Sequence, residues 1–191
     1  MKHLRSCKLL ALGLAVWLAA CTSWRVSTSP GPTSPAVLRK VGDAALLQVD
    51  DTALDWGAGR LGDIVRDTLR ASGTFAEVYY PVEPPNAPSI RLRIEAFGSE
   101  QEHPGLITIG IWLFIPVLVI PILLGVLPMR KTFRVDANVL LMNADREIRR
   151  FSTSASATVS YSMFFSAKHD FEAAAADAAF RQLAEQVAAA L

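Results

Sequence analysis

The sequence is poor in the residues from which metal centres and nucleophilic active sites are usually built. Its 191 residues include two cysteines and three histidines. Lys and Arg (19) nearly balance Asp and Glu (18), and the formal net charge is +1. There is thus no broad basic field of the kind that attracts nucleic acid or anionic lipid, and we expect no nucleic-acid partner.

The first 20 residues predict a bacterial lipoprotein signal peptide. The basic residues Lys2, Arg5 and Lys8 precede an apolar run over residues 9–17, as in secretory signals. The next four residues, Leu-Ala-Ala-Cys, match the lipoprotein cleavage site, and Cys21 is therefore the predicted lipidation site. Its thiol would receive a diacylglyceryl group and its freed amine an acyl chain such as palmitate. An ordinary signal peptide or an uncleaved anchor is the alternative.

Removal of the signal changes what the mature chain can do. Cys7 leaves with the signal and Cys21 is used by lipid, so neither a disulfide nor a thiol metal site remains. Loss of three basic residues leaves a net charge of −2. Thr22 follows the cysteine in place of the Asp that commonly retains lipoproteins in the inner membrane. This favours an outer-membrane lipoprotein facing the periplasm, with the inner membrane as the alternative.

The rest of the chain predicts a tether and one domain. Residues 21–36 are rich in Ser, Thr, Pro and Gly, which is typical of a flexible tether. Residues 37–191 predict an α+β two-layer sandwich, in which two helices cover a mixed, mostly antiparallel sheet of about five strands. The predicted strands are 44–49, 75–80, 90–97, 133–141 and 148–161, and the predicted helices are 61–71 and 170–191.

The longest apolar run is 106–127, LITIGIWLFIPVLVIPILLGVL, in which 16 of 22 residues are Leu, Ile, Val or Phe and none is charged. As one helix it would reach about 33 Å, enough for a hydrocarbon core of roughly 30 Å. We predict that it inserts into a membrane or docks on a partner. Its central residues are Trp112, Phe114, Ile115, Pro116, Val117, Leu118, Val119, Ile120 and Pro121.

Three arrangements of this apolar segment are open. A spanning helix fits its length and its flanks, which are acidic before and basic after. A spanning helix would, however, put strands 90–97 and 133–161 on opposite sides of the bilayer, each with an unpaired edge. A hairpin broken near Pro116 and Pro121 enters one leaflet and returns, so the sheet stays together. We favour this hairpin or a partner-docking loop, and the third arrangement is a buried core element.

A glycine pattern and an acidic cluster precede the first helix. Gly57, Gly59 and Gly62 match GxGxxG, but a dinucleotide fold needs the first glycine directly after a strand, and the segments that follow look antiparallel. We interpret them as loop glycines. Asp50, Asp51 and Asp55 match no ligand spacing, so we interpret them as a solvated turn and expect no cofactor.

Two further polar patterns flank the apolar segment. Glu100, Glu102 and His103 could bind a cation or share a proton, but they match no metal-ligand motif and are interpreted as a polar boundary. The hydroxyl ladder from Ser152 to Ser160 has no recognisable His and Asp partners, which favours the solvated face of a strand. We therefore predict neither a catalytic nor a metal site.

The stretch from Leu69 to Val78, LRASGTFAEV, resembles a unit of bacterial envelope lipoproteins. A helix ending in L-x-x-S-G-x-F before a strand is similar to the α/β unit of the curli-secretion lipoprotein and of the N-terminal domain of the Tol system's periplasmic propeller protein. The resemblance covers residues 44–97 and, more loosely, the last helix. It implies a periplasm-facing α/β domain used for assembly or protein contacts, without catalytic residues. The lipopolysaccharide-assembly lipoprotein has a comparable order of elements.

These patterns predict a non-enzymatic, membrane-anchored envelope lipoprotein, a structural or accessory component of a periplasm-facing assembly. Its expected partners are membrane lipid, through acylated Cys21 and residues 106–127, and an envelope protein. The alternatives are a carrier or chaperone of lipidic cargo and a lipoprotein with one transmembrane helix at 106–127.

Overall fold

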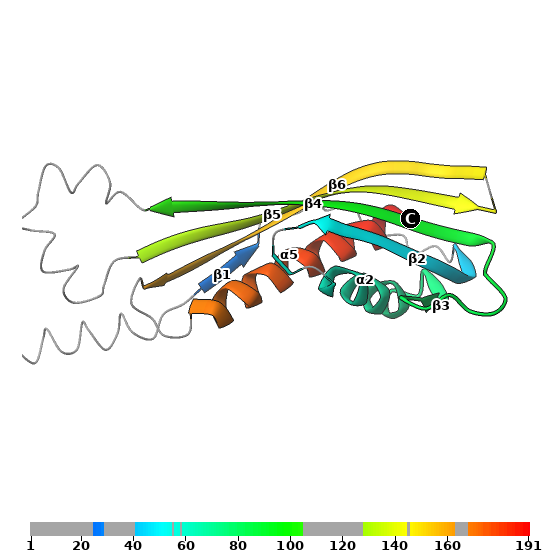
Figure 1. Ribbon diagram of the computed structural model, residues 1–191, viewed down its shortest axis with the longest axis horizontal. Helices are drawn as coiled ribbons and strands as arrows, with labels where there is room; N and C mark the ends of the chain where they lie inside the picture. The colour runs from blue at the N-terminus through cyan, green and yellow to red at the C-terminus, as the bar shows by residue number, and fades with distance from the viewer. Residues whose placement is uncertain are drawn as a thin grey trace, which may run out of the picture.

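Six strands and two helices make up the described part of the chain, residues 25–28, 41–54, 56–57, 59–104, 128–144, 146–162 and 168–191 of a computed structural model. In chain order they are β1 Arg25–Thr28, β2 Gly42–Ala53, α2 Arg60–Ala71, β3 Phe75–Tyr79, β4 Ile90–Pro104, β5 Pro128–Asn143, β6 Arg146–Ser162 and α5 Lys168–Ala190 (Figure 1).

The strands form one mixed sheet in the order β1-β6-β5-β4-β2-β3. The first four are antiparallel neighbours, whereas β2 runs parallel to both β4 and β3. The sheet is curled like half a barrel over α2 and α5, which lie on the same side, here called the inner face (Figure 1). The α+β class and the mixed sheet are confirmed. The predicted count of about five strands and the plain two-layer sandwich are wrong in detail.

The additional strand, β1, lies inside the range predicted to be a tether. Val26 pairs with Val159 of β6, and its side chain packs against the hydrophobic core. A Ser/Thr-rich composition concealed this single, partly buried residue, although Thr is itself favourable in strands. β1 therefore occupies Arg25–Thr28 within the range predicted as a tether.

Two central strands extend well beyond the predicted ranges. β4 continues to Pro104, and β5 already begins at Pro128. They pair in unbroken antiparallel register from Ile90 opposite Asn143 to Pro104 opposite Met129. The alternation of apolar residues stops at Phe97 because the next positions on the inner face are Gly98, Glu100 and Glu102. An alternating apolar pattern indicates which side chains are buried. Backbone pairing of β4 with β5 continues past the point where this pattern ends.

The chain from β2 through α2 to β3 forms a parallel crossover. α2 buries Leu61, Val65 and Leu69, in agreement with the predicted helical spacing. It begins after Gly59 and is followed by Gly73, whose φ angles of 82° and 71° lie in the left-handed region that favours glycine. The strands on either side of α2 were expected to be antiparallel, and this is wrong. α2 carries the chain back to the end of the sheet at which β2 began, so β3 runs parallel to β2.

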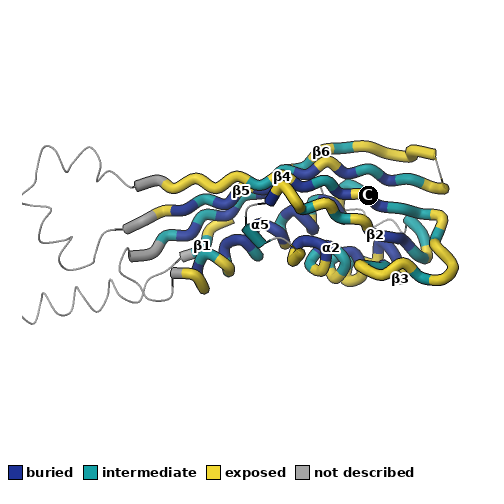
Figure 2. The backbone as a smooth tube through the Cα atoms, viewed as in Figure 1, coloured by how far each residue is buried: buried dark blue, intermediate teal, exposed yellow. Residues whose placement is uncertain are grey.

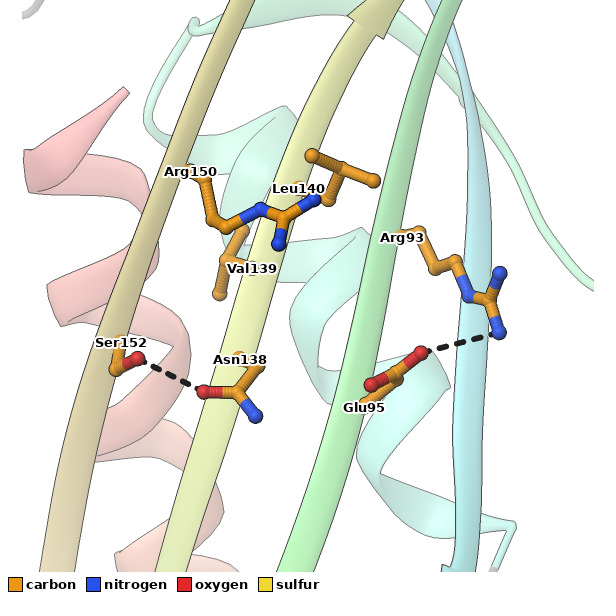
Figure 3. A pocket seen from close by; sticks show the side chains of 7 residues that line it. All are labelled: Arg93, Glu95, Asn138, Val139, Leu140, Arg150 and Ser152. Carbon is orange, nitrogen blue, oxygen red and sulfur yellow. Dashed lines mark hydrogen bonds and ion pairs between the residues drawn. The ribbon is translucent and has the colours of Figure 1, made fainter. Parts of the chain in front are cut away.

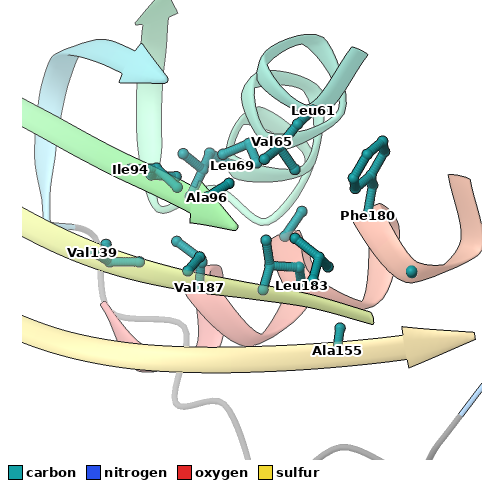
Figure 4. Close-up of a cluster of buried hydrophobic side chains, with 14 of the residues drawn as sticks. Leu61, Val65, Leu69, Ile94, Ala96, Val139, Ala155, Phe180, Leu183 and Val187 are labelled. Carbon is teal, nitrogen blue, oxygen red and sulfur yellow. The ribbon is translucent and has the colours of Figure 1, made fainter. Parts of the chain in front are cut away.

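One apolar layer between the inner face and the helices forms the core (Figure 4). The sheet contributes alternate residues such as Ile94, Val139 and Ala155. α5 contributes the predicted apolar stripe, of which five members are buried: Phe171, Ala175, Ala179, Leu183 and Val187. No described helix covers the opposite, outer face of the sheet, and Figure 2 shows exposed and half-buried residues along it.

Three aromatic rings connect separate elements within this layer. Trp56 meets Phe133 of β5 edge to face at 5.0 Å and stacks on Phe180 of α5 at 5.1 Å. Gly57 lies against the same Phe180 ring, where an added Cβ would stand 2.7 Å from a ring carbon. This cluster therefore fixes the loop before α2 against both the sheet and α5.

Truncating the Phe180 ring should unfold the domain at a lower denaturant concentration. For Phe180→Ala we expect a loss of about 3–5 kcal/mol in the free energy of unfolding, since the ring is fully buried. Phe97→Ala is the matched control, because Phe97 is 48% exposed on the outer face, and it should cost less than about 1 kcal/mol. Urea denaturation followed by circular dichroism measures both. Equal losses for the two variants would contradict the assigned core.

Candidate functional site

The strand ends at one end of the sheet determine where the apolar segment leaves and rejoins the domain. β4 ends at Pro104 and β5 begins at Pro128, and Pro104 stands opposite Met129. Neighbouring strands lie about 5 Å apart. The chain therefore leaves for residues 105–127 and returns from them at adjacent positions of the sheet.

The N-terminal strand enters the sheet at the same end. Arg25 pairs with Ser160, close to the end of β6, and β1 runs antiparallel to β6. Cys21 precedes Arg25 by four residues, which span at most about 14 Å. We call this end of the sheet, where Arg25, Pro104 and Pro128 lie, the insert end. β6 ends and α5 begins there as well (Figure 1).

The predicted attachment residues themselves lie outside the described residues. This applies to Cys21 and to the whole of 106–127, including the residues from Trp112 to Pro121. Within the described part of the chain, neither helix combines the length and the apolar character that crossing a membrane requires.

A charged cluster on the inner face marks the insert end. Lys131 of β5 is only 7% exposed. Its Nζ atom lies 2.5 Å from a carboxylate oxygen of Glu100, 3.2 Å from one of Glu172 and 3.9 Å from one of Glu102. The same ammonium group stands 5.3 Å from the centre of the Phe133 ring. Lys131 thus ties β5 to β4 and to the N-terminal part of α5.

The carboxylates keep this buried lysine charged. Burial alone lowers the pKa of Lys131, but hydrogen bonds to Glu100 and Glu172 and the attraction of both charges outweigh it. The net effect raises the pKa above its ordinary value of 10.5. With one ammonium group and three carboxylates, the cluster carries a formal charge of −2.

The structure divides the predicted boundary group between two faces of the sheet. Glu100 and Glu102 lie together on the inner face as part of the Lys131 cluster, whereas His103 stands opposite Arg130 in the alternate register position. Sequence analysis missed Lys131. The period-two series of buried positions 133, 135, 137 and 139 on β5 includes 131, and this spacing could have revealed it.

The two described acidic residues before α2 accept hydrogen bonds from nearby groups of the chain. Asp51 accepts a hydrogen bond from the backbone N–H of Gly59, and so occupies the helix N-terminus with the protein's own carboxylate. Asp50 accepts hydrogen bonds from the hydroxyl and the N–H of Thr52, which lower its pKa. Asp55 lies outside the described residues. A Cβ at Gly62 would overlap the Tyr80 ring, so packing explains this glycine.

The outer face carries the hydroxyl ladder and a shallow hollow of about 370 Å³ (Figure 3). Ser152 donates a hydrogen bond to Asn138, and Thr132 and Thr158 share another. Each arginine at the hollow has an acidic neighbour, with Arg93 3.0 Å from Glu95 and Arg150 2.8 Å from Glu147. The described residues contain no group of three His, Cys, Asp or Glu side chains placed to hold a metal ion.

Removing the buried ammonium group should destabilise the domain. Lys131→Met leaves Glu100 and Glu172 without their cation, and we expect a loss of about 1–3 kcal/mol at neutral pH. Because the folded pKa is raised, this contribution is complete below pH 10.5 and is lost as the pH rises through the folded pKa. Urea denaturation at pH 7 and at strongly alkaline pH should therefore show the two proteins converging.

The control is Arg93→Met, which breaks an ion pair whose arginine side chain is 53% exposed. It should cost less than about 1 kcal/mol. Equal stability of Lys131→Met and the parent protein at pH 7 would contradict a stabilising role of the cluster.

The fold is similar to that of a solved bacterial lipoprotein structure. A minor lipoprotein from Acinetobacter baumannii matches with a TM-score of 0.50 at 12% identity, over 76% of this chain and 87% of that chain. The rare lipoprotein B from Shewanella oneidensis matches with a TM-score of 0.39 at 14% identity, over 76% and 88%. The PelC dodecamer from Paraburkholderia phytofirmans gives 0.34 at 13% identity, over 85% and 96%. No protein-family model and no curated protein matches the sequence. The comparison with the first of these structures shows a fold that also occurs in a bacterial lipoprotein.

Proposed function

We propose that this chain is a non-enzymatic envelope lipoprotein, attached to a membrane through acylated Cys21 and through residues 106–127. It serves as a structural or accessory component of a periplasm-facing assembly. One observation carries the proposal: the strand ends that lead to both attachments, at Arg25, Pro104 and Pro128, lie at a single end of the sheet.

Two attachments at one end would hold the domain in place. A lipid anchor alone leaves a domain free to move about its tether, whereas a second attachment beside the anchor restricts that motion. Here β1 begins four residues after Cys21, so little tether remains between lipid and sheet. The domain therefore stays close to the bilayer, with its far end directed away.

The register of β4 and β5 favours a segment that returns to its starting side over a spanning helix. Both strands around 106–127 belong to one ladder, from Ile90 opposite Asn143 to Pro104 opposite Met129. A spanning helix would have to separate them and leave long rows of backbone N–H and C=O groups unpaired. The hairpin or docking loop needs no such separation.

The packing of the inner face argues against the alternative of a lipid carrier. The apolar side chains of the sheet are already covered by α2 and α5, with Val65, Phe180 and Leu183 fully buried between the layers. Cargo would have to displace these helices. The hollow on the outer face is lined largely by polar groups and does not suit an acyl chain.

The proposed role in an assembly is supported by the resemblance to curli-secretion and Tol-type domains. That resemblance falls on the crossover from β2 through α2 to β3. It implies a domain that makes protein contacts and has no catalytic residues. Within the described residues the outer face of the sheet has no helix over it. An envelope protein partner, met by this face or by residues 112–121, completes the proposal.

Fractionation of cells tests the two attachments separately. We compare the parent chain with a variant in which 106–127 is replaced by Asn-Gly, a turn that joins antiparallel strands. Each is exported either with its own signal or with a signal that leaves an unacylated N-terminus at Thr22. Only the variant that lacks both lipid and segment should appear in the soluble periplasmic fraction.

The acylated Asn-Gly variant is the control for folding, and it should resist protease as well as the parent chain does. Recovery of the unacylated chain that retains 106–127 in the soluble fraction would contradict the second attachment.

Thiol labelling tests the topology directly, because the mature chain offers no free thiol once Cys21 is acylated. Ser99→Cys and Asn143→Cys place single exposed thiols on β4 and β5, before and after the apolar segment. A membrane-impermeant maleimide added to cells with a permeabilised outer membrane should label both. Labelling of one position only would indicate a spanning helix and refute the proposal.

A further inference from the structure

β3 is the last strand of the sheet, beyond β2. It pairs with β2 and, among the described strands, with no other. The outer edge of such a strand presents a row of backbone N–H and C=O groups, to which another chain can add a strand. A second copy of the same domain carries an identical edge, so a bare edge of this kind favours self-association.

Two arginines of α2 reach the backbone of β3. The Nη2 atom of Arg70 donates a hydrogen bond to the carbonyl oxygen of Val78 at 2.7 Å. The Nη1 atom of Arg66 lies 3.5 Å from the carbonyl oxygen of Tyr80. Four residues of a helix rise about 6 Å and two residues of a strand about 6.7 Å, so the two arginines match the spacing of alternate carbonyl groups.

The contact with Val78 is made at the outer edge of β3. α2 turns its apolar side toward the sheet, where Val65 and Leu69 are fully buried. Arg70 is exposed, so its side chain reaches β3 around the edge that faces away from β2. Backbone groups of alternate residues point to the same side of a strand, and the next residue on this edge is Ala76, which is also exposed.

A strand that paired with this edge would have to displace the Arg70 side chain. The guanidinium group stands in front of the Val78 carbonyl group, which the added ladder needs as an acceptor. A hydrogen bond from a charged donor is stronger than the bond between neutral backbone groups that would replace it. Pro81 follows directly and has no N–H, so an added ladder could not continue past the end of β3.

The two arginines differ in how they are held. Arg66 also forms ion pairs with Asp63 and Asp67, each at 2.9 Å. Arg70 has no ion pair with a described side chain, and its bond to Val78 is its contact with the sheet. Substitution of Arg70 therefore uncovers the edge without leaving a described carboxylate unpaired.

We propose that Arg70, assisted by Arg66, closes the β3 edge to strand addition by a second copy of this domain. The contact is autoinhibitory, because the domain covers a pairing edge with side chains of its own helix. The inference goes beyond the proposed function and does not depend on the membrane attachments.

Sedimentation equilibrium of the full acylated chain in density-matched detergent tests the proposal. Arg70→Met keeps an unbranched side chain along α2 but removes the donors. We expect R70M to self-associate about tenfold more tightly than the parent chain, since a hydrogen bond from a charged group no longer has to be broken. R66M/R70M should associate more tightly still.

The matched control for the double variant is R93M/R134M. It removes two arginines from exposed ion pairs on the outer face of the sheet and should associate as the parent chain does. Arg70→Lys, which retains a charged donor, should also behave like the parent chain.

A second substitution shows where the copies meet. Ala76→Pro removes an N–H on the outer edge of β3, which an edge strand tolerates but an added strand requires. In the R70M background it should return self-association to the level of the parent chain.

Two results would overturn the proposal. If R70M associates no more tightly than the parent chain, the arginine does not close the edge. If the tighter association of R70M persists in A76P/R70M, the copies meet at another surface or through unfolded chain. Either result leaves the two proposed membrane attachments unaffected, because cell fractionation tests those separately.

Discussion

The antiparallel ladder between β4 and β5 is the constraint on which the remaining structure depends. It lies at the centre of the sheet, with β6 and β1 on one side and β2 and β3 on the other. It also closes the chain around residues 105–127, because Pro104 and Met129 are paired neighbours. Opening it would expose backbone groups along two strands, each of which costs free energy when left unpaired away from water. The chain therefore enters and leaves residues 105–127 at two adjacent positions of the sheet.

The inner face of this ladder changes character along its length. Over its middle, Ile94, Val139 and their neighbours form a core with α2 and α5. At the insert end, Lys131 and its carboxylates replace apolar contacts with charged hydrogen bonds. Buried ion pairs contribute less to stability than hydrophobic packing of the same volume, but they restrict the partners that a surface can accept. The cluster thereby sets the position of α5 beside the proposed membrane attachment.

Sequence reasoning predicted the elements whose side chains alternate between core and solvent. It found α2 through Leu61, Val65 and Leu69, and α5 through its apolar stripe, because burial imposes their period. It missed β1 and the extension of β4, where backbone pairing continues without an apolar pattern. Strand pairing depends on contacts between distant segments, which a short stretch of sequence does not reveal, so the parallel pairing of β2 with β3 and β4 was missed.

The candidate site was predicted only in outline. Glu100 and Glu102 were recognised as a polar boundary beside the apolar segment, but Glu172 lies far along the chain and only the fold brings it to Lys131. Likewise, net charge describes the whole chain, whereas the separation of Arg130 from Lys131 depends on which face each residue occupies. The alternating geometry of a strand converts two adjacent basic residues into one external and one internal charge.

The unequal rise of helix and strand has a consequence for the far end of the molecule. At about 1.5 Å per residue, the 23 residues of α5 cover roughly 35 Å, whereas the 17 residues of β6 extend about 55 Å. The hairpin between β5 and β6 must project past the helix, and residues 146–150 are indeed exposed. Leu141 is buried opposite Arg149, so a graft of an epitope or a fluorescent tag belongs beyond this pair, at the tip between Asn143 and Arg146.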